Sequence, residues 1–81
     1  MNIYLLEQSS NTGYDTYDSC VCIAKNEEAA RNTTPSSYSI WGCGDTYTDW
    51  AYKPSDVKVT KIGLADSGED AGVICASFNA G

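Results

Sequence analysis

Histidine is absent from this chain of 81 residues, and basic residues are scarce, with five Lys and Arg against eleven Asp and Glu. Without histidine, the Ser-His and Cys-His pairs that activate nucleophiles cannot form, and the commonest metal ligand is missing. So few basic residues leave no basic stripe to displace counterions, so we expect no direct binding of nucleic acid phosphates. The sequence also has no apolar run near the ~20 residues of a membrane-spanning helix.

The start of the chain, MNIYLLEQ, lacks the basic residues and the long apolar centre of a secretory signal. We therefore expect a cytoplasmic protein, in the cytoplasm of a host cell, with reduced cysteines. Cys20 and Cys22, spaced C-x-C in an expected strand, would lie on one face with Cα atoms about 7 Å apart, which argues against a bond between them. The interpretations are buried thiols, a disulfide from Cys20 or Cys22 to Cys75, or a zinc site that includes Cys43.

Composition predicts one small folded domain. Hydrophobic residues are 42% and charged residues 20% of the chain, which is typical of globular proteins. The length suits a single compact domain over residues 1–81. The net charge of −6 would suit docking on a basic protein surface, although a small domain also carries such a charge for solubility.

Strand and turn signals along the chain predict an α+β domain. Asn26 should cap a short helix that runs to about Arg31 and stops before Pro35. The fold class is then an antiparallel or mixed sheet of four or five strands with one short helix packed on a face. Residues 19–25 and 72–80 are apolar or small on both faces, which predicts that both strands are interior to the sheet. The expected strands are residues 2–8, 19–25, 57–63 and 72–80, with a further short strand at 38–41.

An aromatic and acidic stretch, residues 38–52, follows the helix and contains both tryptophans. Its Asp-Thr-Tyr at residues 45–47 repeats the one at residues 15–17. Tyrosine and tryptophan are enriched at interface hot spots, so two such loops predict a binding surface. The alternative is that Trp41 and Trp50 fold back over the sheet to enlarge the core. The predicted partner-binding residues are Asp15, Tyr17, Asp18, Asp45, Tyr47, Asp49 and Trp50.

Five phrases, NIYLLEQ, NTGYDTYDS, NEEAAR before a Pro-Ser, PSDVKVT followed by Ile62-Gly63, and GVICASFNAG, resemble a family of small phage and prophage proteins. The resemblance covers nearly the whole chain except residues 38–50 and implies a viral accessory protein. It supplies no catalytic or ligand residue. By analogy with other small acidic phage proteins, it points to an inhibitor of host defence of the anti-CRISPR kind.

The sequence therefore predicts a phage-encoded interaction protein that is not an enzyme and uses no cofactor or metal. Its partner would be a host protein with a basic, nucleic-acid-binding surface, such as a CRISPR effector subunit, and the acidic loops would act as a DNA mimic. Two alternatives stay open. One is an assembly module that forms a homo-oligomer through a strand edge or the aromatic stretch. The other is a binding module stabilised by a metal on its cysteines.

Overall fold

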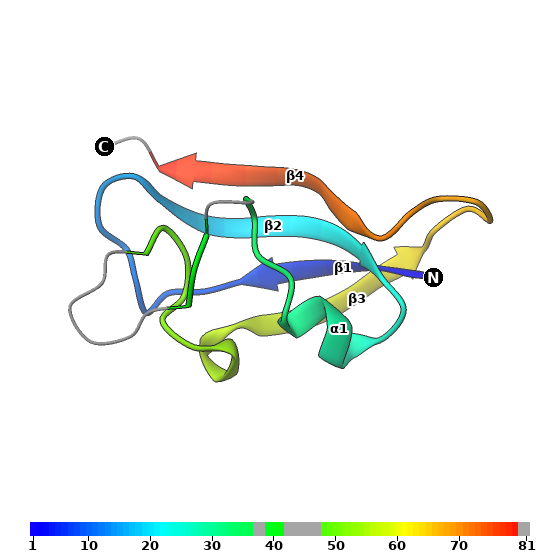
Figure 1. The fold of residues 1–81 in the computed structure, drawn as a ribbon, viewed down its shortest axis with the longest axis horizontal. Helices are drawn as coiled ribbons and strands as arrows, with labels where there is room; N and C mark the ends of the chain where they lie inside the picture. Colours follow the sequence, from blue (N-terminus) through cyan, green and yellow to red (C-terminus); the bar gives the residue numbers. More distant parts are fainter. Residues whose placement is uncertain (37–38, 42–47, 80–81) are drawn as a thin grey trace.

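The computed structural model describes residues 1–36, 39–41 and 48–79, and in these residues four strands form one antiparallel sheet in the order β3-β1-β2-β4 (Figure 1). One short helix and one 3-10 turn accompany the sheet. The antiparallel, four-stranded form of the predicted fold is therefore the one observed. The elements are β1 (Asn2–Glu7), β2 (Thr16–Ala24), α1 (Glu27–Arg31), η1 (Pro54–Asp56), β3 (Lys58–Leu64) and β4 (Gly72–Asn79).

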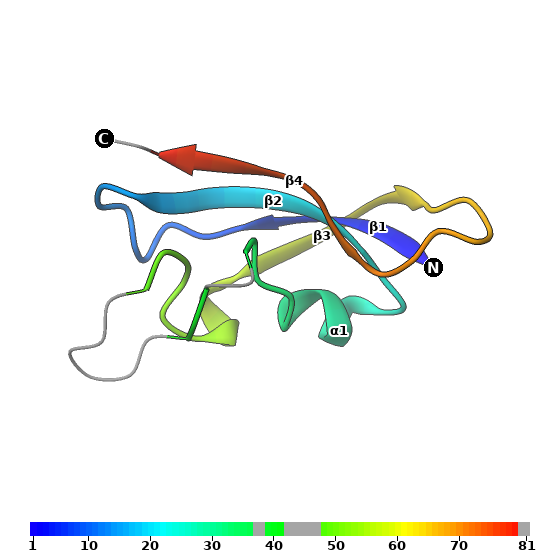
Figure 2. The same ribbon diagram turned by 45° about the horizontal axis from the view of Figure 1, so that its top comes forward.

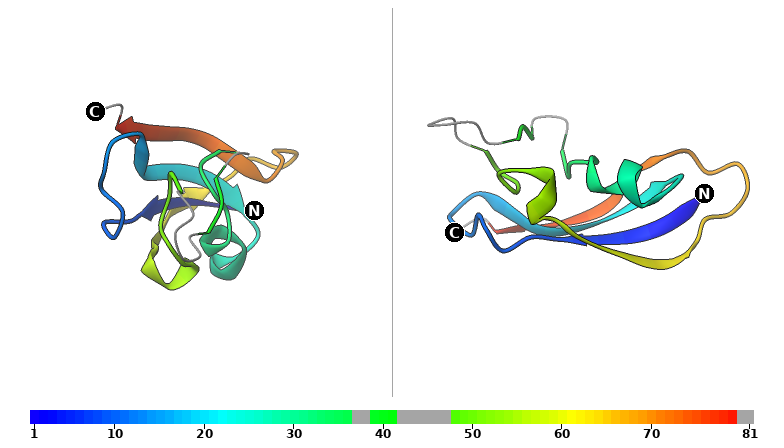
Figure 3. Two further views of the ribbon diagram at one scale, coloured as in Figure 1. Left: turned by 60° about the vertical axis from the view of Figure 1, so that its left-hand side comes forward. Right: turned by 90° about the horizontal axis from the view of Figure 1, so that it is seen from below.

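The core lies on the side of the sheet that faces α1 and the segments around η1, and Figures 2 and 3 show these on the same side. Residues on this covered face alternate along β1 and β2, where Tyr4 stands opposite Cys22 and Leu6 stands opposite Cys20. All four are buried, and Trp50 packs among them with no exposed surface. The C-x-C spacing thus places both thiols in the core, as the sequence predicts.

Helix α1 begins where the sequence predicts. The Asn26 side chain accepts a hydrogen bond from the Ala29 N–H at 2.8 Å, and Glu27 and Glu28 occupy the first turn. The single buried helical residue is Ala30. At the other end, the Arg31 guanidinium donates to the carbonyls of Pro54 and Val57, and so ties α1 to η1 and the start of β3.

Strand β3 shows the predicted alternation. Val57 is buried and Val59 packs against the core, whereas Lys58 and Thr60 are exposed. The chain then crosses the end of the sheet to reach β4 at the opposite edge, and the Ala65 N–H donates to the Met1 carbonyl at 3.0 Å on the way. Gly68 has a φ of 96° in this crossing, a conformation that glycine adopts without strain.

Two predictions about strands are wrong. Strand β4 is an edge strand rather than an interior one, and each of its eight residues is exposed, because α1 packs mainly on β1, β2 and β3. Residues 39–41 belong to no strand, and Tyr38, the first residue of that expected strand, lies outside the described residues. In addition, β2 begins at Thr16 rather than near residue 19, so part of the expected first loop is strand. The interior position of β2 is confirmed.

On the other side of the sheet, which we call the open face, Figures 2 and 3 show neither α1 nor η1, although Ile23 at one end of this face is buried. The strand register builds it from rows of side chains. One row carries Ile3 and Ile23, and the next carries Thr60, Leu5, Val21 and Cys75. A third row carries Lys58, Glu7, Ser19 and Ser77. The open face therefore changes from apolar to polar along the strands.

Candidate functional site

The turn that leads into β2 and the start of β2 itself each carry one of the predicted contact residues as an exposed carboxylate, Asp15 in the turn and Asp18 in the strand. Asp15 has a φ of 58°, a left-handed conformation in which aspartate is enriched. Its backbone N–H donates to the Asn79 carbonyl at 2.7 Å, which joins the turn to the end of β4. The Asp18 Oδ1 accepts from the Ser19 Oγ at 3.2 Å. Both side chains are open to solvent at the same end of the sheet.

Two nearby tyrosines, one in this turn and one at the start of β2, differ in exposure. Tyr14 is 75% exposed, whereas Tyr17 is half-buried against the core. The Tyr17 ring meets the Phe78 ring edge-on, with 4.8 Å between centroids. The Tyr17 N–H donates to the Asp49 carbonyl at 2.7 Å. The start of β2 thus lies beside the residues that follow the second Asp-Thr-Tyr, and the exposed aromatic side chain of the turn is Tyr14.

Of the remaining predicted contact residues, the structure describes Asp49 and Trp50, and neither is exposed. Trp50 is fully buried, so its side chain fills the protein's own core and is not exposed for a partner, which corrects the surface role predicted for it. The alternative, that a tryptophan folds back over the sheet, holds for this residue. Asp49 is half-buried. Asp45 and Tyr47 lie outside the described residues.

A buried polar network supports this end of the molecule. The Asn11 Nδ2 donates to the carbonyls of Thr48 and Trp50 at 2.7 and 2.8 Å, and the Gln8 Oε1 accepts from the Asn11 N–H at 2.9 Å. The Gln8 Nε2 donates to the carbonyls of Asn11 and Tyr17. Gln8 and Asn11 are both buried. Because their hydrogen bonds hold three separate segments, the acidic turn is fixed relative to the sheet.

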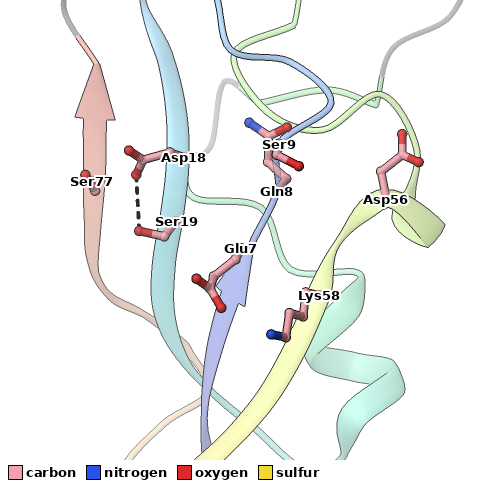
Figure 4. Close-up of a pocket in the computed structure, with 8 residues that line it drawn as sticks. All are labelled: Glu7, Gln8, Ser9, Asp18, Ser19, Asp56, Lys58 and Ser77. Carbon is pink, nitrogen blue, oxygen red and sulfur yellow. Dashed lines mark hydrogen bonds between the residues drawn. The ribbon is translucent and has the colours of Figure 1, made fainter.

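Below this turn, the polar row of the open face forms a shallow hollow of about 580 Å³ (Figure 4). Glu7 on β1 stands opposite Lys58 on β3 in the register. Asp18 on β2 and Asp56 on η1 lie on either side of this pair in Figure 4. The lining thus contains three carboxylates and one ammonium group. We call this hollow the acidic hollow. Its lining residues are Glu7, Gln8, Ser9, Asp18, Ser19, Asp56, Lys58 and Ser77.

Sequence reasoning found only Asp18 of this lining. The alternation of β3 did place Lys58 away from the core, and the same period-2 pattern applied to β1 would have placed Glu7 on that side. No sequence signal shows that β1 and β3 are neighbours. Fifty residues lie between Glu7 and Lys58 in the chain, and only the strand order brings the two side chains together.

The cysteines that the structure describes are free thiols in two environments. Cys20 and Cys22 are buried, whereas Cys75 is exposed. Burial raises the pKa of the Cys20 thiol from its usual 9.0 to about 12, and repulsion from Cys22 and Cys75 adds to the shift. Burial also raises the pKa of Cys22, partly offset by a hydrogen bond with the Thr33 side chain. Cys75 stands opposite Val21 and so lies on the open face, which rules out the cross-strand disulfide to Cys20 or Cys22 in this arrangement.

Among the residues that the structure describes, no group of three or more Cys, Asp or Glu is arranged to hold a metal ion. In that part of the chain there is also no helix with the length and apolar character needed to cross a membrane.

Comparisons of the chain with protein-family models, with curated proteins and with solved structures gave no match. The resemblance to small phage proteins therefore depends on the sequence phrases alone.

Proposed function

We propose that this protein is an interaction protein that docks its acidic end on the basic, nucleic-acid-binding surface of a partner protein. The observation that carries the proposal is the acidic hollow, in which carboxylates from β1, β2 and η1 surround one lysine on an uncovered part of the sheet. A lysine or arginine side chain of the partner would enter the hollow and meet Glu7, Asp18 and Asp56.

The charge of the whole chain supports the same partner. A net charge of −6 attracts a basic surface over about one Debye length, which is ~8 Å at physiological ionic strength. Asp15, exposed in the turn above the hollow, extends the acidic surface beyond it. Carboxylates held at fixed positions on a sheet and an anchored turn would occupy the places of nucleic acid phosphates, which is the action of a DNA mimic.

Tyr14 supplies the aromatic contact that the sequence assigned to Trp50. It is the most exposed of the large hydrophobic side chains that the structure describes, at 75%. It lies in the same turn as Asp15, and Asp18 follows at the start of β2. Tyrosine buries a large area with few rotatable bonds, so an exposed tyrosine beside charged residues fits the centre of a polar interface.

The phage-like phrases suggest the biological setting for this docking. A viral protein in the cytoplasm of a host cell that covers a basic host surface would block a defence or regulatory machine that works on nucleic acid, as anti-CRISPR proteins do. The proposed partner is therefore a host nucleic-acid-binding protein, with a CRISPR effector subunit as the specific candidate.

The test compares two triple variants that change the charge equally, from −6 to −3. One replaces the hollow carboxylates (Glu7→Gln, Asp18→Asn, Asp56→Asn), and the other replaces the acidic side chains of the β3–β4 crossing (Asp66→Asn, Glu69→Gln, Asp70→Asn). Tagged wild type and both variants are used to capture proteins from a bacterial host lysate at physiological salt. For each captured protein, the affinity and its ability to bind DNA are then measured.

We expect the hollow variant to lose about tenfold or more in affinity, since three contacts of ~0.5–1 kcal/mol each sum to that ratio. The crossing variant should stay close to the wild type. Wild type should also compete with DNA for the captured protein. Equal losses in both variants would show a non-specific charge effect, and no loss in either would exclude the hollow as the docking site.

A further inference from the structure

In the part of the chain that the structure describes, strand β4 forms an edge of the sheet that no other segment pairs with. It pairs with β2 on one side, and all eight of its residues are exposed. None of them is charged and none is proline. An edge strand of this kind presents unpaired N–H and C=O groups to any other strand that can approach, and natural proteins usually block such edges.

The opposite edge of the same sheet is blocked in the usual way. Strand β3 carries Lys58 and Lys61, and a bulge interrupts its pairing with β1 near Ile62. Lysine on an edge strand resists pairing because two copies would bring like charges together. The pairing of β4 with β2 shifts register twice, near Ile74 of β4 and at Asp18 of β2, and the regular part of β4 between these shifts is Cys75 to Ser77. The two edges therefore differ mainly in charge.

We propose that β4 pairs antiparallel with β4 of a second copy of this chain, so that two four-stranded sheets join into one. A second copy is favoured over a charged partner protein because β4 has no charged side chain that could pair with the charges of such a partner. A copy of itself needs no such complement, and the pairing places no like charges opposite each other despite the −6 of each chain. The proposal does not depend on the docking role of the acidic hollow.

The pleat of the strand limits the register. Residues directly opposite each other in a sheet must face the same side. One residue must therefore stand opposite its own copy, and the two-fold axis that relates the two chains passes between these two copies. Registers centred on Cys75, Ala76 or Ser77 satisfy this condition and use the regular part of the strand. Each of them places Ala76 within the paired segment.

The arrangement closes at two chains. A two-fold axis uses the same surface on both copies, and the free edges that remain are the two lysine-bearing β3 strands. The axis runs perpendicular to the sheet, so the open faces of both copies lie on the same side. The assembly is therefore a dimer and not a filament.

The test measures mass in solution by sedimentation over a range of concentrations under reducing conditions. Ala76→Lys places a charge within the proposed pairing, and Thr60→Lys is the matched control, an exposed residue on the opposite edge that receives the same charge. Wild type and Thr60→Lys should shift from 8.7 kDa towards about twice that mass as concentration rises. Ala76→Lys should dimerise at least about tenfold more weakly.

A second measurement does not depend on how Ala76→Lys folds. With Cys43→Ser in place, a bismaleimide with a flexible spacer should link two chains through Cys75, since Cys20 and Cys22 are buried. Direct oxidation to a disulfide should succeed only for the register centred on Cys75. A wild type that stays at 8.7 kDa at its solubility limit overturns the proposal. The proposal is also overturned if Thr60→Lys abolishes the dimer while Ala76→Lys does not. It is overturned as well if the dimer forms but the bismaleimide links no chains through Cys75.

Discussion

The side chain of Asn11 joins the β1–β2 turn to the segment before η1, and its removal should destabilise the fold strongly. Its Nδ2 donates to two carbonyls, those of Thr48 and Trp50, and the residue is 8% exposed. In Asn11→Ala both carbonyls lose this donor in a buried site, at a cost of ~1–3 kcal/mol each. We expect a total loss of about 2–5 kcal/mol in the free energy of unfolding. A domain of this size has roughly 4–12 kcal/mol in all.

Urea denaturation, followed by far-ultraviolet circular dichroism, measures this loss as a lower midpoint with an unchanged slope. By heat, 2 kcal/mol corresponds to a fall in Tm of at least about 8 °C. Asn11→Asp keeps the size of the side chain but removes the two N–H donors, so it should cost at least as much as the alanine. Thr12→Ala, at the exposed neighbour, is the control and should change stability by less than ~0.5 kcal/mol. A cost below ~1 kcal/mol for Asn11→Ala would refute the hydrogen-bonding argument.

Two further predictions concern single residues. The pKa of Cys20 is about 12 in the folded protein against a usual 9.0, so the unfolded chain loses this proton first and stability should fall as pH rises from about 9 towards 12. Cys20→Ala should flatten that part of the stability-against-pH curve relative to wild type, and an unchanged slope would contradict the shift. Asn26→Ala removes the side-chain acceptor of the Ala29 N–H and should cost about 1 kcal/mol, or roughly 4–8 °C in Tm by calorimetry, whereas Asn26→Asp should keep the cap.

The two proposed surfaces share one end of the sheet without competing. Ser77 belongs to β4 and also lines the acidic hollow, while Glu7, Asp56 and Lys58 lie across the sheet from the β4 edge. A β4 pair would place two acidic hollows on the same side of a joined sheet. Docking by such a pair on a repetitive basic surface would gain from bivalency. Loss of the dimer in Ala76→Lys should therefore weaken docking without changing the hollow itself.

Local features of the fold could be predicted from the sequence because each depends on residues near in the chain. The cap at Asn26 needs only an acceptor side chain and the N–H of Ala29, three residues later. The C-x-C spacing of Cys20 and Cys22 places both on one face of any extended strand. Where β3 begins, alternation alone separates buried Val57, just before the strand, from exposed Lys58. These predictions hold whatever the strand order is.

Burial of particular aromatic and polar side chains depended on the tertiary structure. Trp50 lies in an acidic, aromatic stretch that reads as a surface loop, yet it fills the space between the sheet and the segment around it. Gln8 and Asn11 are polar residues next to a turn, yet both are buried. Their side-chain amides donate hydrogen bonds to backbone carbonyls of other segments, those of Tyr17 and Thr48 among them. Hydrogen bonds between residues about 40 positions apart leave no periodic pattern in the sequence.

The sequence by itself determined where most strands and the helix lie, the face on which the core forms, and the acidic character of the surface. Only the tertiary structure decided which strands became edges. β4 has apolar residues on both faces, as a buried strand does, but strand order puts it at the rim, beyond the reach of a five-residue helix. The same order brings Glu7, Lys58 and Asp18 together. The alternation of side chains along a strand indicates which face of the sheet a residue lies on, whereas the residue beside it depends on the pairing of strands that are distant in the chain.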